Sequence, residues 1–413
     1  MFFLDLFSGA GGLAEGFIRE GFMPLAHVEM DTDAINTLHT RLAYHYLFTN
    51  GKFQYYVDYL ENKIDRDNLY DLLPEKLNES LINEVLSETT LDEICQKIEN
   101  SMKVNNCNSI DVLIGGPPCQ TFSIIGRNSK KFEDKKDQRN NLYKIYAELL
   151  GRFKPKCFVF ENVPGLQSIK KGEVYDNLLK LIEEKGYYVY PQILDASDFG
   201  VLQKRKRLII TGWSKELPFK DITYSKTNLN SVIVSDLFRD LSKINPGEEK
   251  NIYSHDPSEY LLASGIRANS AIPLTQHICR YQNSNDREIY RIAAELWNRE
   301  RKRLIYNELP ENLKTRSYSE SFADKYKVVA GDEQYSHTII AHIAKDGHYY
   351  IHPDYNQARS ITVREAARIQ SFSDDYYFEG SRLKKFTQIG NAVPPIMAMQ
   401  IAKEIKIMLN KIV

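Results

Sequence analysis

The sequence contains few cysteines, and they form no paired motif. Five cysteines occur among 413 residues, and none belongs to a CxxC pair. Structural zinc sites and secreted disulfide frameworks both depend on closely or regularly spaced cysteines. We therefore expect neither of them, and we expect an intracellular protein. Four histidines, His277, His337, His342 and His352, are too scattered along the chain to predict a metal site.

A long hydrophobic run and a strong net charge are also missing. The first residues, MFFLDLFSGAGG, are apolar over only a few positions before the glycines begin, so we expect neither a signal peptide nor a membrane span. The formal net charge is -1, which excludes a global positive field that would attract nucleic acid. Any contact with nucleic acid must then come from local basic clusters, for which 130–139 and 299–303 are candidates.

What the first half of the sequence does contain is a regular alternation of strand and helix patterns. FFLDLF, PLAHVEMD, IDVLIGG and KCFVFENV have the continuous apolar character of strands that are buried on both faces, and helical patterns separate them. The segments 186–200 and 207–213 are typical of a closing antiparallel pair. This alternation predicts an α/β fold with a mostly parallel sheet and helices on both faces.

The length of the chain predicts two lobes, because single hydrophobic cores stop growing near roughly 250 to 300 residues. We expect a larger domain at 1–213, with a helical insertion at about 58–109, and we expect 384–413 to complete it. The residues 214–383 lose the alternation and become rich in polar side chains, which predicts a smaller, irregular domain with a hinge. The last segment reads as an amphipathic helix that docks on the first domain.

The first predicted strand ends in a glycine-rich turn, DLFSGAGG. Glycines at 9, 11 and 12 allow the backbone to approach a ligand closely, and Glu29, at the end of the next strand, is placed to bind ribose hydroxyls. The adjacent glycines depart from the GxGxxG pattern of dinucleotide sites. S-adenosylmethionine, which has no pyrophosphate, therefore fits better, and a tight turn without a ligand is the alternative.

A second group of chemical side chains follows the next strands. Cys119 comes directly after GGPP, a rigid platform from which a thiol can be aimed. Glu161 ends the third strand, and Arg205 and Arg207 stand at the start of the fourth. Strand ends of this kind meet at the ligand-binding edge of an open α/β sheet. Taken singly, Glu161 could instead cap a helix and the arginines could be surface charge.

A thiol, a carboxyl group and guanidinium groups at one sheet edge suit methyl transfer to carbon 5 of cytosine. This carbon is a poor nucleophile until a thiolate adds to carbon 6 of the ring. A carboxylic acid at ring nitrogen 3 then stabilises the adduct, and an arginine supports the developing charge on the ring oxygen.

These motifs, in this order, resemble those of the DNA cytosine-5 methyltransferases, in particular the bacterial restriction-modification type. DLFSGAGG with Glu29 is similar to the cofactor motifs of that family, GGPPCQTFS to its nucleophile loop, ENV to its acid and QKRKRLI to its arginine strand. RSITVREAARIQSF and QIGNAVPP resemble the last two blocks. The resemblance covers most of 1–213 and about 359–400. It implies a Rossmann-like S-adenosylmethionine-dependent methyltransferase sheet, with 214–383 as target-recognition domain and hinge.

The resemblance also implies roles for single residues. Cys119 would be the nucleophile, Glu161 the acid at ring nitrogen 3, and Arg207, with Arg205 nearby, the arginines of the catalytic strand. The implied cofactor contacts are Phe7, Gly9, Gly11, Gly12, Leu13, Glu29, Pro118, Leu142, Asn391 and Val393, and the implied DNA contacts are Gln120, Ser123, Arg127 and Arg139. The family also has an aspartate near the adenine, for which Asp58, Asp65 and Asp67 stay open as candidates.

The implied activity is methylation of a cytosine flipped out of a short duplex DNA sequence, with S-adenosylhomocysteine as product and no metal. The expected setting is a monomer in the bacterial cytoplasm, associated with the nucleoid, with a separately encoded restriction endonuclease as a candidate partner. The alternatives are a tRNA methyltransferase of the same fold, a catalytically inactive DNA-binding regulator and a nicotinamide oxidoreductase. The polar segment after Trp213 favours DNA over tRNA, and the intact Cys119, Glu161 and Arg207 favour an enzyme over a regulator. The recognition sequence is not predicted.

Overall fold

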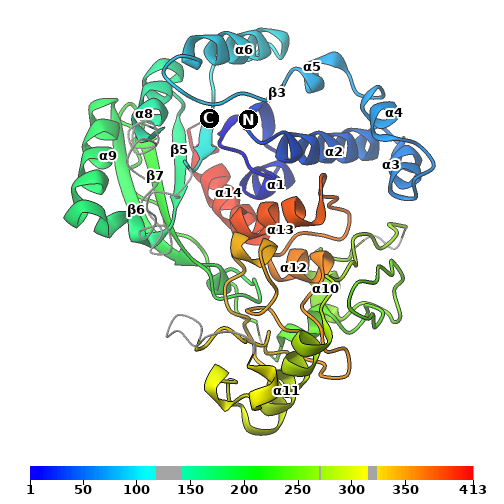
Figure 1. Cartoon of the computed structure of the whole chain (residues 1–413). Coiled ribbons are helices and arrows are strands. Elements are labelled where there is room, and N and C mark those ends of the chain that lie inside the picture. Colours follow the sequence, from blue (N-terminus) through cyan, green and yellow to red (C-terminus); the bar gives the residue numbers. More distant parts are fainter. Residues whose placement is uncertain (118–141, 230, 269–270, 315–322, 413) are drawn as a thin grey trace.

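The computed structural model describes residues 1–117, 142–229, 231–268, 271–314 and 323–412. Its upper part is built on a seven-stranded sheet with the strand order β3-β2-β1-β4-β5-β7-β6 (Figure 1). The strands are β1 (Phe2–Leu6), β2 (Met23–Val28), β3 (Leu81–Ile82), β4 (Val112–Gly115), β5 (Cys157–Asn162), β6 (Tyr187–Asp195) and β7 (Lys206–Ser214). Neighbouring strands are parallel, except that β7 runs antiparallel to both β5 and β6.

This sheet confirms the predicted α/β class, the four buried strands and the closing antiparallel pair. It differs from the prediction at β3, which lies inside a stretch that we expected to be wholly helical. Two residues of strand give no period that could be told from the helical pattern around them. The strand matters because it extends the parallel edge beyond β2, with His27 opposite Leu81 and Val28 opposite Ile82.

Helices cover both faces of the sheet, as the continuous apolar strands predict. One face carries α1 (Gly12–Arg19) and α14 (Pro395–Leu409), and its core includes Phe3, Val159 and Trp213. The other face carries α6 (Leu91–Val104), α8 (Leu142–Phe153) and α9 (Glu173–Glu184). The helix α2 (Thr32–Thr49) follows β2.

The C-terminal helix α14 packs against α1, which confirms the predicted docking of the last segment. The two helices approach so closely that a Cβ added at Gly16 would lie 2.3 Å from the backbone of Ala398 and Met399. The helix that follows the first glycine turn and the last helix of the chain therefore lie side by side (Figure 1).

The lower part of Figure 1 holds most of the residues between β7 and α14. Its elements are short apart from α11 (Ser284–Glu300). The others are α10 (Glu259–Ala263), α12 (Val363–Ile369), α13 (Arg382–Asn391) and the 3-10 segments Val234–Leu237, Tyr306–Glu308, Glu311–Leu313 and Ala341–Ala344. A small core surrounds α11, whereas the rest continues the core beneath α1 and α14. The irregular second lobe matches the predicted fold class, and its boundaries, 214 and 383, stay predictions.

The predicted helical insertion, about 58–109, begins inside α3 (Phe53–Leu60), and its later part contains β3 and α6, which belong to the sheet and its covering helices. The helices α3, α4 (Arg66–Tyr70) and α5 (Glu75–Asn78) share a small core with α2. Two further 3-10 segments, Pro164–Gly172 and Ala196–Asp198, follow β5 and β6. Within the described ranges, no helix is long and apolar enough to cross a membrane.

Candidate active site

The turn after β1 has the backbone of a ligand-binding loop. Gly9 and Gly11 have φ values of 53° and 77°, a region that glycine enters without strain. Phe7 adopts φ 55°, which an aromatic residue rarely does, and such strain concentrates at functional sites. A Cβ placed on Gly9 would meet no atom within 4 Å. The turn therefore presents bare backbone to open space.

The rear of the same turn is packed tightly against the C-terminal part of the chain. A Cβ at Gly12 would lie 2.3 Å from the carbonyl oxygen of Val393. Val393 is buried, while Asn391, the last residue of α13, is exposed. Gly12 and Val393, two predicted cofactor residues 381 positions apart, thus lie in contact.

Glu29 follows β2 and reaches back to the turn. Its Oε2 accepts a hydrogen bond from the backbone N–H of Gly9 at 2.8 Å, and its Oε1 accepts one from Asp31 N–H at 2.9 Å. Burial raises the pKa of the Glu29 carboxyl above its usual value, against the lowering effect of these hydrogen bonds. Glu29 and Gly9 are therefore brought together as predicted, with a carboxylate at the mouth of the turn.

A neighbour of Glu29 was missed by the sequence analysis. Asn83 comes directly after β3, is exposed, and donates from Nδ2 to the carbonyl oxygen of Glu29 at 3.0 Å. Only the recognition of β3 could have found it.

The three aspartates that were candidates for the adenine contact lie in the predicted insertion. Asp58 accepts a hydrogen bond from Gln54, and Asp65 caps α4, which begins one residue before Asp67.

The predicted acid and one predicted arginine form an ion pair at the same edge of the sheet. Arg207 Nε lies 2.8 Å from Glu161 Oε1, and their side chains are 11% and 16% exposed. A Cβ at Gly116 would lie 2.8 Å from Glu161 Oε2, so the chain that follows β4 runs directly past this carboxyl group. The two side chains are held together and remain accessible.

Asn162, also missed, controls the path of this same chain. The side chain is buried next to Glu161 and donates from Nδ2 to the carbonyl oxygen of Pro117 at 3.2 Å. The described chain stops at Pro117, two residues before Cys119. The ENV triplet therefore contains both the predicted acid and a side chain that anchors the approach to the predicted nucleophile.

Arg205, two residues before Arg207, has hydrogen-bond partners of a different kind. It is fully buried and donates to the carbonyl oxygens of Ile339, Gly390 and Ala392 at 2.5, 2.9 and 2.9 Å. Burial, and then the nearby Arg207, lower the pKa of its guanidinium. These contacts describe a side chain that joins β7 to the second lobe and to the end of α13.

The remaining predicted site residues are placed as follows. Leu13 is buried in the core under α1, and Leu142 and Phe7 are half-buried against the opposite core. Cys119, Pro118, Gln120, Ser123, Arg127 and Arg139 lie outside the described residues.

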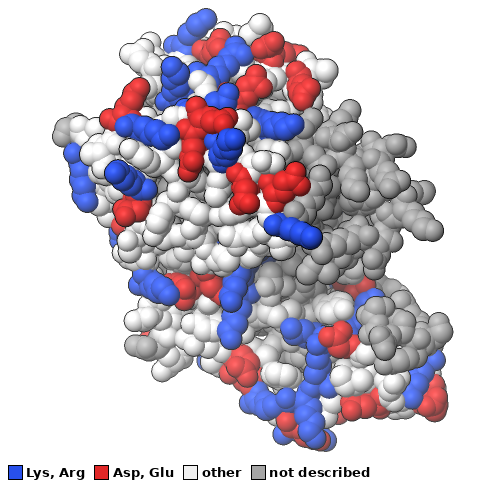
Figure 2. Space-filling view, turned by 90° about the vertical axis from the view of Figure 1, so that its left-hand side faces the viewer, with Lys and Arg blue, Asp and Glu red and all other residues white. Residues whose placement is uncertain are grey.

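The basic cluster at 299–303 is largely neutralised within the chain. Lys302 and Arg303 pair with Glu300 and Asp324, both at 2.8 Å, and Arg301 pairs with Asp332. Figure 2 shows acidic and basic side chains interspersed over the upper part of one face, and a strip of Lys and Arg in its lower part. The part of the chain that the structure describes contains no group of three or more potential metal ligands.

The fold and this edge define a class of protein. A parallel sheet closed by an antiparallel pair, with a glycine turn and an acidic residue at the ends of β1 and β2, is the architecture of a Rossmann-like methyltransferase. A prophage-encoded E. coli protein, described as a DNA modification methyltransferase, has this fold with a TM-score of 0.66. The two sequences are 24% identical, and the match covers 99% of each chain.

Sequence comparisons define the family. The model of the C-5 cytosine-specific DNA methylases matches residues 1–53 and 77–407. A type II methyltransferase from Bacillus paralicheniformis is 39% identical over 99% of both chains. Another, from Haemophilus parahaemolyticus, is 30% identical over 98% of this chain and 86% of its own. The chain belongs to the C-5 cytosine-specific DNA methylase family and is a DNA cytosine-5 methyltransferase.

Proposed function

We propose that the chain transfers the methyl group of S-adenosylmethionine to carbon 5 of a flipped-out cytosine in a short duplex DNA sequence, through a covalent adduct with Cys119. The observation that supports this most strongly is the Glu161–Arg207 pair beside the chain that leads to Cys119. The type II relatives further support a restriction-modification setting.

The residues at the ends of β1, β2 and β3 fit the cofactor. S-adenosylmethionine supplies an electrophilic methyl group on a sulfonium centre. The bare backbone at Gly9 leaves room for it, Glu29 would bind the ribose hydroxyls, and Asn83 would face the adenine, whose edge pairs well with an amide. Asn391 would close the site from α13.

The reaction then assigns one task to each catalytic side chain. The Cys119 thiolate adds to carbon 6 of the cytosine, which makes carbon 5 nucleophilic enough to take the methyl group. Glu161 donates a proton to ring nitrogen 3 as the adduct forms, and Arg207, which holds the Glu161 carboxyl at 2.8 Å, supports the charge on the ring oxygen. The methyl transfer leaves S-adenosylhomocysteine. A water molecule then takes the proton from carbon 5, the bond between carbon 6 and sulfur breaks to release the Cys119 thiolate, and the proton on ring nitrogen 3 returns to Glu161.

Arg205 contributes to this arrangement through its position and does not touch the base. Its three carbonyl partners fix the start of β7, and hence Arg207, against Ile339 and the end of α13. The DNA contacts implied at Gln120, Ser123, Arg127 and Arg139 stay predictions, as do the monomeric state, the absence of a metal and the paired endonuclease.

The test is a transfer assay with radiolabelled S-adenosylmethionine on duplex DNA of diverse sequence and on bulk tRNA. We expect label only in DNA, at carbon 5 of cytosine, and loss of transfer in Glu161→Gln. Label in tRNA alone would replace this proposal with the tRNA alternative. Binding of DNA without any transfer would support the inactive regulator.

A further inference from the structure

Residues 54–76, here called the α3–α4 insertion, contact the glycine turn after β1 indirectly, through one intermediate segment. The family model leaves residues 54–76 unmatched, so this stretch is an addition to the common family scaffold. It begins within α3, at the far end of α2 from the sheet (Figure 1). Its aromatic side chains, Tyr56, Tyr59 and Tyr70 among them, pack in a small core with α2.

This small core also contains two residues from the second lobe. Ile272 is buried in it, and the ring of Tyr377 packs against it, 5.6 Å from the ring of Tyr59. The insertion therefore bridges α2, which follows the cofactor strand β2, and the segment 372–379, which leads into α13.

Two tyrosine hydroxyls of α3 hold this segment by hydrogen bonds. Tyr56, which is fully buried, donates to the carbonyl oxygen of Asp375 at 2.7 Å. Tyr59 donates to Glu379 Oε1, also at 2.7 Å, and Thr40 of α2 donates to the same oxygen at 2.6 Å. Tyr56 thus binds the first residue, and Tyr59 the last, of the five-residue stretch 375–379.

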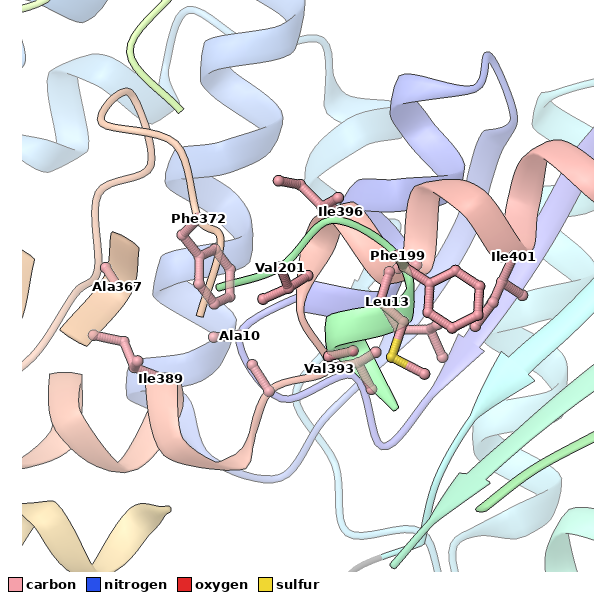
Figure 3. Close-up of a cluster of buried hydrophobic side chains, with 14 of the residues drawn as sticks. Ala10, Leu13, Phe199, Val201, Ala367, Phe372, Ile389, Val393, Ile396 and Ile401 are labelled. Carbon is pink, nitrogen blue, oxygen red and sulfur yellow. The ribbon is translucent and has the colours of Figure 1, made fainter. Parts of the chain in front are cut away.

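The stretch between these attachment points forms the rear wall of the cofactor turn. The Tyr376 hydroxyl donates to the carbonyl oxygen of Ala10, and a Cβ at Gly11 would lie 2.9 Å from this hydroxyl. Phe372, three residues before this stretch, packs beside Ala10, as Figure 3 shows, and a Cβ at Gly12 would lie 3.3 Å from its ring. Displacement of this stretch would displace the turn that carries Gly9.

We propose that Tyr56 and Tyr59 are positioning residues for the S-adenosylmethionine site, which they support through the stretch 375–379. The inference rests on the proposed cofactor and assigns a role to an insertion that the family model does not include. Neither side chain needs to touch the cofactor, because Tyr376 transmits their hold to Ala10.

The test is the affinity for S-adenosylhomocysteine, measured by calorimetry on the full chain in Tyr56→Phe, Tyr59→Phe and the double variant. Each substitution removes one hydroxyl and retains the ring. We expect each single variant to raise Kd by about twofold to tenfold, with a larger rise in the double variant. In transfer assays, KM for S-adenosylmethionine should rise while kcat at saturation is retained.

Tyr187→Phe is the matched control for a purely structural effect. Tyr187 is buried and donates to the carbonyl oxygen of Pro155 at 2.8 Å, at the opposite end of the sheet. It should lower Tm as the α3 variants do and leave Kd unchanged. Glu379→Gln, which keeps an Oε1 acceptor, should retain more affinity than Glu379→Leu.

Two results would overturn the inference. One is an unchanged Kd in the double variant, and the other is an equal rise in Tyr187→Phe. If the unmodified chain bound no S-adenosylhomocysteine, the proposed cofactor itself would be wrong, and this inference would fall with it. If the unmodified chain and the double variant bound S-adenosylhomocysteine with the same Kd, only this inference would be refuted, and the proposed cofactor would stand.

Discussion

Replacement of Glu29 by glutamine tests whether the proposed cofactor site needs both carboxylate oxygens of this residue as hydrogen-bond acceptors. Each carboxylate oxygen of Glu29 accepts one backbone N–H, from Gly9 at 2.8 Å and from Asp31 at 2.9 Å. Glutamine offers only one oxygen, so its amide group must face one of these two N–H donors. The turn then loses an acceptor on one side, and the ribose hydroxyls lose a charged partner.

The size of the effect follows from these bonds. A part-buried donor left without its acceptor costs about 1 to 3 kcal/mol. If this cost falls on the cofactor-bound form, S-adenosylhomocysteine affinity drops by about 5-fold to 150-fold. Calorimetric titration measures the affinity, and thermal unfolding separates it from general instability.

Asp111→Asn is the matched control for Glu29→Gln. The two oxygens of Asp111 accept from Phe2 N–H at 2.7 Å and from Lys156 Nζ at 2.6 Å, at the opposite edge of the sheet. It should lower Tm and leave cofactor affinity unchanged. Wild-type affinity in Glu29→Gln, or an equal loss in Asp111→Asn, would refute the placement of the ribose beside Glu29.

Three further outcomes follow from the structure. Burial raises the pKa of Glu29 in the free protein, whereas ribose contacts favour its carboxylate form, so cofactor affinity should fall as the pH falls through that raised pKa. The same raised pKa, taken alone, makes the free protein more stable at low pH. A Kd that stays constant from pH 7 down to pH 4.5 would contradict this prediction. Gly16→Ala should destabilise the chain by about 1 to 3 kcal/mol, because the added Cβ would lie 2.3 Å from the α14 backbone. Gly151→Ala is the control and should not destabilise it, because its Cβ would meet only the flexible Lys185 side chain at 3.0 Å. Equal Tm values for the two variants would refute the argument. Arg205→Lys should destabilise by about 1 to 3 kcal/mol, since one ammonium cannot replace a planar guanidinium on three carbonyls, and an unchanged urea midpoint would show that these bonds are dispensable.

The parts of the fold that could be predicted are those with a strong local signal. β1, β4 and β5 are buried on both faces and follow one another through recognisable turns, so their ends, and with them the turn at Gly9 and Glu161, could be placed on one edge. β3 could not be found, because Leu81 and Ile82 are too few to show a period. Asn83 was missed for the same reason.

The residues that sequence reasoning could not place depend on contacts between distant segments. Arg205 and Arg207 have the same chemistry and stand two residues apart at the beginning of β7, yet only Arg207 pairs with Glu161, because the carbonyl groups of Ile339 and Ala392 bind Arg205. No local pattern encodes that enclosure. The hydrogen bond from Tyr376 to Ala10, which joins residues 366 positions apart, is equally invisible in the sequence.

The most direct test of the central claim is to express the unmodified chain and its Cys119→Ala variant in a host without cytosine methylation and to map 5-methylcytosine at single-base resolution. The proposed mechanism predicts methylation confined to one short sequence in the first case and none in the second. Methylation that persists in Cys119→Ala would contradict the covalent mechanism. Its absence from both would contradict the assignment of cellular duplex DNA as the substrate.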